Sequence, residues 1–247
     1  MRTVAVVQAR MGSNRFPGKV MCDLAGRPLI DWVLSRVMLS ALVDCTVLAT
    51  TDSYLDDALA LYAAGLGVAV YRGDENDVLG RVASAADEAG AEWVVRVCAD
   101  SPFVDPGEID RLIEFYRSHQ TDYACNHQDR SGSGYPDGFG AEILSMSLLR
   151  HLVAHTVDPR QREHVTLHLW DNPERFRLTP VPVPPELAYP DLRFDVDVPV
   201  DLMRLDAFLE KSSLDVTASA AQIVEAANGD AWGGEVRDPR SWRDEGV

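Results

Sequence analysis

Residues 4–19 read VAVVQARMGSNRFPGK, and this stretch decides the fold of the chain. An apolar run over residues 3–8 has the character of a buried strand, and it passes directly into a short, basic, glycine-containing loop that a helix follows. In α/β proteins such a loop holds phosphate, because backbone N–H groups that a tight turn leaves unpaired point at the anion while arginine and lysine neutralise it. The stretch therefore predicts a nucleotide site at the end of the first strand.

The loop follows neither of the two common phosphate-binding patterns. The Walker pattern needs a hydroxyl residue directly after its lysine, whereas Val20 follows Lys19 here, and Gly12 and Gly18 lie one residue too far apart. The dinucleotide pattern Gly-x-Gly-x-x-Gly is absent as well. A basic turn after a strand is common in proteins, so the assignment depends on the other residues of the loop.

Residues 9–19 read Ala-Arg-x-Gly-Ser-x-Arg-x-Pro-Gly-Lys, which resembles the opening motif of the cytidylyltransferases that make CMP-activated sugar acids, in particular their spore-coat polysaccharide subgroup. The resemblance implies that Lys19, Arg15 and Asp100 are catalytic. It also implies a nucleotide site made of the loop and of one arginine beyond it, namely Ala9, Arg10, Gly12, Ser13, Arg15, Lys19 and Arg72.

Composition limits the classes of function that remain. The chain has 247 residues, 46% of them apolar, which suffices for one large α/β domain with a substantial core. A net charge of −16 argues against partners such as nucleic acid or an anionic membrane, because both need a positive surface. An anionic substrate must therefore be held by local positive charge and by metal ions.

The cellular compartment is predicted from the cysteines and the start of the chain. The four cysteines lie far apart without metal-ligand spacing, and the sequence enters a strand at once rather than a signal peptide. No apolar run approaches the roughly 20 residues that cross a bilayer. We therefore expect a cytoplasmic protein with reduced thiols.

Strand-like and helix-like segments alternate through the first half of the chain. We expect strands at residues 3–8, 45–49, 68–71 and 93–97, and helices at residues 28–39, 54–64, 77–89 and 106–118. Such alternation predicts an α/β fold with a three-layer, Rossmann-like, mostly parallel sheet, and the resemblance implies its GT-A-like nucleotidyltransferase form. Ligands of such sheets bind beyond the carboxyl ends of the strands, where the loop and Asp100 both fall.

The alternation breaks between residues 126 and 185. After a loop-rich stretch at residues 129–140, we expect a strand at 141–144, helices near Leu148 and at 160–170, and a strand near 175–181. We predict a single domain over residues 1–247 with residues 126–185 as an inserted arm or lid. In the resembling family this arm packs against a second subunit, which implies a homodimer. A proline-rich connector at residues 181–190 leads back to the core, and the polar tail at 228–247 is expected to be partly mobile.

Two aspartates from distant parts of the chain are candidate metal ligands. Asp100 follows the strand at residues 93–97, and Asp197 precedes a helix that begins at Pro199. Carboxylate oxygens suit Mg²⁺, which also takes phosphate oxygens and serves nucleotidyl transfer in this way. Each aspartate also has an ordinary interpretation, as the end of a strand or as a helix N-cap.

The family motifs favour the metal interpretation for both aspartates. Residues 100–102 resemble the family's Asp-x-Pro, and residues 196–202 resemble its Val-Asp-Thr-Pro-Glu-Asp-Leu. The resemblance therefore implies a Mg²⁺ ion on Asp100 and Asp197. We expect Asp201 only to favour the N-terminal dipole of its helix, and Asp195 to be either an auxiliary ligand or a solvent-facing residue.

Three further motifs supply arginines and an acceptor site. Residues 71–81, YRGDENDVLGR, would present Arg72 to the nucleotide and Arg81 to phosphate or acceptor, or else they form an exposed arginine and a capped helix. Residues 135–142 and 162–166 resemble the spore-coat subgroup's Tyr-Pro-x-Gly-x-x-x-Glu and Arg-Glu-His-Val-Thr. The implied acceptor site consists of Arg81, Tyr135, Asp137, Glu142, Arg162 and His164. A histidine within a helix is more often a packed residue, so we do not assign it as a base.

Together these features predict an enzyme that uses CTP and Mg²⁺ to transfer CMP to an acidic acceptor, a sugar acid or a phosphonate, with release of pyrophosphate. Two other classes stay open. A nucleotide-sugar-dependent GT-A glycosyltransferase would use residues 195–197 as an Asp-x-Asp metal motif, and a regulatory module would bind nucleotide without catalysis. Release of pyrophosphate from CTP distinguishes the three.

Overall fold

The computed structural model describes residues 1–126 and 133–229, so the predicted tail from residue 230 onward and part of the loop at 129–140 lie outside it. A seven-stranded sheet with the strand order β5-β4-β1-β6-β8-β7-β9 forms its centre. The strands are β1 (Thr3–Gln8), β4 (Cys45–Thr51), β5 (Ala69–Gly73), β6 (Trp93–Cys98), β7 (Tyr123–Cys125), β8 (Glu142–Ser145) and β9 (Leu178–Pro180). Strand β8 is antiparallel to both of its neighbours, and the other neighbouring pairs are parallel.

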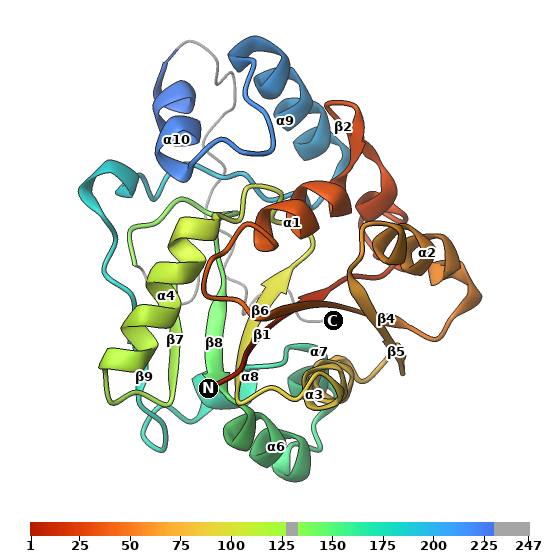
Figure 1. Ribbon diagram of the computed structural model, residues 1–247, viewed down its shortest axis with the longest axis vertical. Helices are drawn as coiled ribbons and strands as arrows, with labels where there is room; N and C mark the ends of the chain where they lie inside the picture. Colours follow the sequence, from red (N-terminus) through yellow and green to blue (C-terminus); the bar gives the residue numbers. More distant parts are fainter. Residues whose placement is uncertain (127–132, 230–247) are drawn as a thin grey trace.

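Helices cover both faces of the sheet, which confirms the predicted three-layer α/β fold. One face carries α1 (Leu29–Val37), α2 (Asp57–Gly65) and α4 (Pro106–Ser118), and the other carries α3 (Val78–Glu88), α6 (Met146–His155) and α8 (Leu167–Asp171) (Figure 1). Successive residues of a strand point to opposite faces, so Ala5 and Val7 of β1 pack toward the first set of helices and Val4 and Val6 toward the second.

A third core lies beyond the sheet and carries the end of the described chain. Here α9 (Pro199–Ser212) and α10 (Ala220–Asn228) pack with Trp32, Phe103 and Phe194, and Figure 1 shows both helices beyond α1. The fully buried Arg36 of α1 donates to the carbonyl oxygens of Val104, 2.7 Å, and Ala218, 2.7 Å. This arginine therefore ties the third core to the helical layer.

The expected helices and strands of the first half are found within a few residues of their predicted bounds. The helix expected at residues 54–64 is divided into η2 (Tyr54–Asp56) and α2, and the helix expected at 28–39 follows a small hairpin of β2 (Asp23–Leu24) and β3 (Arg27–Pro28). In the second half, β7 and α10 were not predicted. The proline-rich connector contains one short turn, η3 (Pro185–Leu187).

The helix expected at residues 160–170 is two helices, α7 (Pro159–Glu163) and α8. Between them Val165 is fully buried, and the Thr166 hydroxyl donates to Glu142 Oε2 at 3.0 Å. Val165 and Thr166 are β-branched, which slightly lowers helix propensity, and the hydrogen bond to Glu142 favours the break at this point.

Part of the predicted insertion at residues 126–185 lies in the central sheet. Strand β8 pairs with β6 and β7, β9 pairs with β7, and α6 and α8 cover one face. That this segment also serves as an arm to a second subunit stays a prediction. Over the two described ranges, no helix combines the length and the apolar character that crossing a bilayer requires.

Gly138 allows its loop to pack closely against the segment that leads to Asp197. The Asp137 amide donates to the Leu192 carbonyl oxygen and the Phe194 amide to the Asp137 carbonyl oxygen, both at 2.9 Å, so the two segments lie side by side. Gly138 has a φ of +92°, and a Cβ at this position would stand 2.7 Å from the Asp195 nitrogen. Only glycine therefore fits between the loop and the segment that leads to Asp197.

Replacing Gly138 by alanine should lower the free energy of unfolding by about 2–5 kcal/mol, since it adds a backbone clash to the cost of a left-handed residue. Urea unfolding measures this loss. Gly67→Ala is the matched control, because Gly67 has a φ of +81° and open space at its Cβ position. The control should lose only about 1–2 kcal/mol; equal losses would contradict the steric account.

Candidate active site

The loop after β1 closes on Met11. The Gly18 and Ser13 amides donate to the Met11 carbonyl oxygen at 2.8 and 3.0 Å, and Gly18 takes a φ of +75° that glycine adopts without strain. The short helix η1 (Lys19–Met21) then begins at Lys19. Both ends of the loop therefore meet at one residue, and the lysine side chain starts from a fixed backbone.

Lys19 joins the two predicted metal ligands. Its ammonium donates to the Val196 carbonyl oxygen at 2.7 Å and lies 3.6 Å from Asp100 Oδ2 and 3.7 Å from Asp197 Oδ1. Arg15 Nη2 lies 2.8 Å from Asp197 Oδ1. The structure thus brings Arg15, Lys19, Asp100 and Asp197 to one place from three distant parts of the sequence.

Backbone hydrogen bonds hold the segments of Asp100 and Asp197 next to each other. The Val196 amide donates to the Asp100 carbonyl oxygen at 2.8 Å, next to the end of β6. The Asp201 carboxylate accepts the amides of Asp197, 3.0 Å, and Val198, 2.9 Å, where α9 begins, which confirms its expected place at a helix N-terminus. Asp195 turns to Arg193, whose guanidinium donates to both of its carboxylate oxygens.

The electrostatics of this cluster suit a divalent cation. Burial, Asp100 and Asp195 raise the pKa of Asp197 to about 6, although Lys19 and Arg15 act against the shift. Asp100 keeps 34% of its side chain exposed, so its oxygens can be reached from solvent. Two hard carboxylates that both lie within 4 Å of one ammonium, and so close to each other, fit Mg²⁺. Mg²⁺ keeps several waters and takes phosphate oxygens, which would complete its ligand set beside the two aspartates. Residues 1–126 and 133–229 hold no group of three or more side chains that could bind a metal ion.

Two of the predicted nucleotide arginines contact the protein away from this cluster. Arg10 donates to the Glu75 carbonyl oxygen at 3.2 Å and pairs with Glu163 Oε1 at 2.9 Å. Arg72 donates to the carbonyl oxygens of Thr51, 2.9 Å, and Ser53, 2.6 Å. Arg72 therefore braces the turn between β4 and α2, whereas Arg10 connects the loop to α7.

The remaining predicted nucleotide residues belong to the loop itself. Ala9 continues the β1–β4 pairing through its amide, which donates to the Ala49 carbonyl oxygen at 3.3 Å. Gly12 leaves room for a neighbouring acid, because a Cβ there would stand 2.7 Å from Glu75 Oε1. Ser13 is half-buried and closes the turn through its amide.

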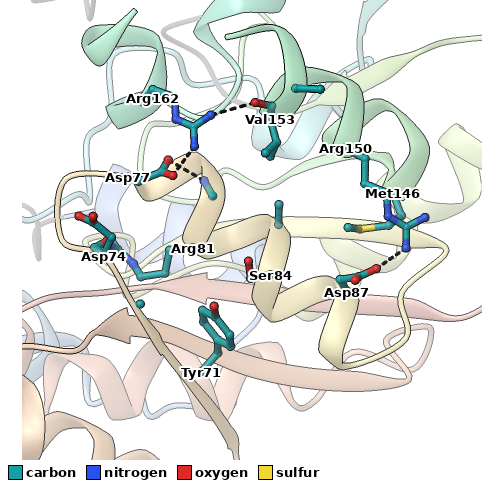
Figure 2. A pocket seen from close by; sticks show the side chains of 14 residues that line it. Tyr71, Asp74, Asp77, Arg81, Ser84, Asp87, Met146, Arg150, Val153 and Arg162 are labelled. Carbon is teal, nitrogen blue, oxygen red and sulfur yellow. Dashed lines mark hydrogen bonds and ion pairs between the residues drawn. The ribbon is translucent and has the colours of Figure 1, made fainter. Parts of the chain in front are cut away.

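The predicted acceptor residues Arg81 and Arg162 share a cavity. It measures about 440 Å³ and lies along α3, between β5 and α6 (Figure 2). Arg162 pairs with Asp77 at the start of α3 and donates to the Val153 carbonyl oxygen at 3.0 Å. Arg81 is buried and donates to the Asp74 carbonyl oxygen at 2.6 Å; burial and the nearby Arg10 lower its pKa.

The other predicted acceptor residues lie elsewhere. The Tyr135 side chain is buried in the third core, and Asp137 Oδ2 lies 3.3 Å from Arg193. His164 ends α7, where its amide donates to the Arg160 carbonyl oxygen at 3.0 Å. The structure therefore does not gather the six predicted acceptor residues around one cavity.

Glu142 is fully buried within the sheet. Its carboxylate accepts hydrogen bonds from Arg96, Tyr123 and Thr166, so it joins β6, β7 and the turn between α7 and α8. A carboxylate enclosed in this way acts on the position of its neighbours and is not open to a ligand.

Sequence patterns did not point to Asp56 or Glu163. Asp56 accepts a hydrogen bond from the Met11 amide at 2.8 Å, and Glu163 pairs with Arg10, so each contacts the loop from a distant element. In the sequence both are acids within a predicted helix. Neither pattern differs from that of ordinary surface residues.

Comparison with known proteins gives a consistent result. The family model described as cytidylyltransferase matches residues 4–226. The spore coat polysaccharide biosynthesis protein SpsF of Bacillus subtilis is 29% identical over 228 residues, which cover 90% of this chain and 92% of that protein.

Two solved structures share the fold. A cytidylyltransferase from Leptospira borgpetersenii superimposes with a TM-score of 0.87 at 26% identity, over 96% of this chain and 100% of that one. A CMP:2-keto-3-deoxy-manno-octonic acid synthetase, solved in complex with CTP, has a TM-score of 0.63 at 18% identity, over 85% of this chain and 99% of that one. The second similarity establishes the nucleotidyltransferase fold.

Truncating Glu142 to alanine should cost about 3–5 kcal/mol of stability, because Arg96 would keep a buried charge without its partner. Chemical denaturation measures this loss. The control is Asp87→Ala, which breaks the exposed Arg150–Asp87 pair and should cost at most about 1 kcal/mol. A stable Glu142→Ala protein would contradict the structural role given to this residue.

Proposed function

The chain belongs to the cytidylyltransferase family, and we propose that it transfers CMP from CTP to a small acidic acceptor, a sugar acid or a phosphonate, with release of pyrophosphate. Membership makes it a nucleotidyltransferase. The observation that carries the finer proposal is the convergence of Arg15 and Lys19 on Asp100 and Asp197. This arrangement supplies cations for a triphosphate and hard oxygens for a metal ion in one place.

The triphosphate would lie over the loop at residues 10–19. Arg15 and Lys19 have flexible side chains that can exchange their present carboxylate partners for phosphate oxygens, which also form charge-assisted hydrogen bonds. Asp100 and Asp197 would hold Mg²⁺, which when bound neutralises charge on the α-phosphate. The base and the ribose would then lie toward the carboxyl ends of β1 and β4, as ligands do in such sheets.

The reaction needs little covalent chemistry from the protein. An acceptor oxygen attacks the α-phosphorus in line, the bond to the β-phosphate oxygen breaks, and pyrophosphate leaves. Lys19 and Arg15 stabilise the charge that develops on the leaving group, and the closed loop keeps them oriented. We assign the acidic acceptor to Arg81 and Arg162, since both line the cavity beside α3.

The family resemblance supports a proposal about assembly: the protein is a homodimer in which residues 126–185 contact the second subunit. The cysteine spacing supports a cytoplasmic location.

The glycosyltransferase alternative receives less support. It requires Asp195 and Asp197 as a joint metal motif, yet both carboxylate oxygens of Asp195 accept hydrogen bonds from Arg193, and Lys19 lies near Asp100 and Asp197. It also leaves the loop cations without a triphosphate to bind. Incubating the protein with each of the four NTPs, Mg²⁺ and a panel of sugar acids and phosphonates tests the assignment, with pyrophosphate as the expected product from CTP. Release of a nucleoside diphosphate from a nucleotide sugar, supplied in a parallel incubation in place of the NTPs, would instead favour the glycosyltransferase.

Replacing Lys19 by alanine should lower kcat by about 10²–10³-fold, because one preorganised cation at the leaving group is lost. Steady-state assays of pyrophosphate release measure the effect. Lys211→Ala, in the exposed last turn of α9, is the matched control and should keep full turnover. A Lys19→Ala enzyme with near wild-type kcat would exclude the proposed role.

Replacing Asp100 by asparagine should raise the Mg²⁺ concentration needed for half-maximal activity at least about tenfold, because a charged ligand becomes neutral. Titration of activity with Mg²⁺ at saturating CTP provides the measurement. The comparison variant Asp195→Asn should change this concentration much less. The reverse ranking would favour the Asp-x-Asp alternative.

A further inference from the structure

The carboxylate of Asp56 lies directly behind the phosphate loop. Asp56 is 1% exposed and stands at the end of η2, between β4 and α2. Its Oδ1 accepts the Met11 amide at 2.8 Å, and its Oδ2 accepts the Thr50 hydroxyl at 2.8 Å, the Thr51 amide at 3.0 Å and the Thr51 hydroxyl. One oxygen therefore holds the end of β4 and the other holds the loop.

Met11 is the residue on which the loop closes. Its carbonyl oxygen accepts hydrogen bonds from the amides of Ser13 and Gly18, and its own amide donates to the Asp56 carboxylate. The peptide groups on both sides of Met11 are thereby fixed. Any rotation about this residue would move the two amides that close the turn and shift the start of η1, from which Lys19 extends.

The turn that carries Asp56 is itself rigid. Arg72 donates to the carbonyl oxygens of Thr51 and Ser53, and the Ser53 hydroxyl accepts the Leu55 amide. The chain of contacts therefore runs from Arg72 through this turn to Asp56 and on to Met11. Arg72 thus supports the loop from a distance.

A carboxylate behind an anion-binding loop is unfavourable unless its charge is compensated. Burial raises the pKa of Asp56, but the hydrogen bonds from Thr51, Met11 and Thr50 outweigh burial and lower it, so the group stays ionised. Its lone pairs are directed at these donors and away from solvent. The negative charge of Asp56 therefore strengthens the hydrogen bonds that hold the backbone at Met11 and Thr51.

We propose that Asp56 is a positioning residue for CTP, which preorganises the loop by holding the Met11 peptide group before the nucleotide arrives. This inference rests on the proposed function. A loop ordered in advance loses less conformational entropy on binding, so its ligand binds more tightly. Asp56 contacts no part of the substrate in this role.

The test is the substitution Asp56→Asn. An asparagine oxygen turned toward Thr51 and Thr50 places its NH₂ group against the Met11 amide, where two donors face each other, so the loop contact is lost selectively. Isothermal titration calorimetry with CTP and Mg²⁺ should show an affinity weakened about tenfold or more.

Two controls separate this role from general stability. Thr50→Val removes one hydrogen bond to the same carboxylate and leaves the Met11 contact in place. Asp110→Asn alters a carboxylate of the same kind far from the loop, which accepts the Ser40 hydroxyl and the amides of Ala41 and Leu42. Both controls should lower the melting temperature and keep wild-type CTP affinity.

The outcomes are distinct. If the wild-type protein binds CTP and Asp56→Asn binds it equally well, the positioning role is wrong while the proposed function stands. If the wild-type protein binds no CTP, the proposed function fails and this inference with it. If Asp56→Asn does not fold, hydrogen exchange of the nucleotide-free wild-type protein decides: a slowly exchanging Met11 amide supports preorganisation, and one that is protected only after CTP is added overturns it.

Discussion

The attraction between the Lys19 ammonium and the two carboxylates of Asp100 and Asp197 is the interaction on which the site depends. Two carboxylates brought together in a partly buried place are unfavourable, and burial, together with repulsion from Asp100 and Asp195, raises the pKa of Asp197. A cation must therefore come from another part of the chain. The fold brings this cation to the carboxylates by placing the loop after β1, the end of β6 and the start of α9 at the same edge of the sheet.

The position of Asp197 relative to Lys19 and Asp100 is set by parts of the structure outside the sheet. The segment that leads to Asp197 is held on one side by the loop around Gly138 and on the other by the helix cap of Asp201. Phe194 of the same segment packs against Phe103 in the third core, which also holds the segment in place. The sheet sets the edge at which ligands bind, and the third core sets where on that edge the second aspartate stands.

Apolar periodicity predicted the three layers and most strands and helices, because it is a local signal. The meeting of Lys19 with Asp100 and Asp197 was expected from the resemblance of three short motifs to those of the family. Sequence patterns could not predict the short β7 or the division of α7 from α8, since both follow from tertiary contacts such as the one between Thr166 and Glu142. Glu142 was expected at the acceptor because residues 135–142 resemble a family motif, whereas the structure encloses its carboxylate in the sheet. A motif gives the identity of a residue, and only the fold shows whether its side chain is enclosed.

Charge pairing in the loop bears on how a nucleotide would enter. Arg10 pairs with Glu163, Arg15 with Asp197 and Lys19 with Asp100, so each loop cation already has a carboxylate partner. A triphosphate that took over these cations would leave the carboxylates uncompensated in a protein of net charge −16, at a cost that grows as solvent is excluded. A nucleotide that arrives with a divalent cation removes this cost, because Asp100 and Asp197 gain a new partner as Lys19 and Arg15 are released. The same pairing thus accounts for both the stability of the nucleotide-free loop and the requirement for a metal that we propose.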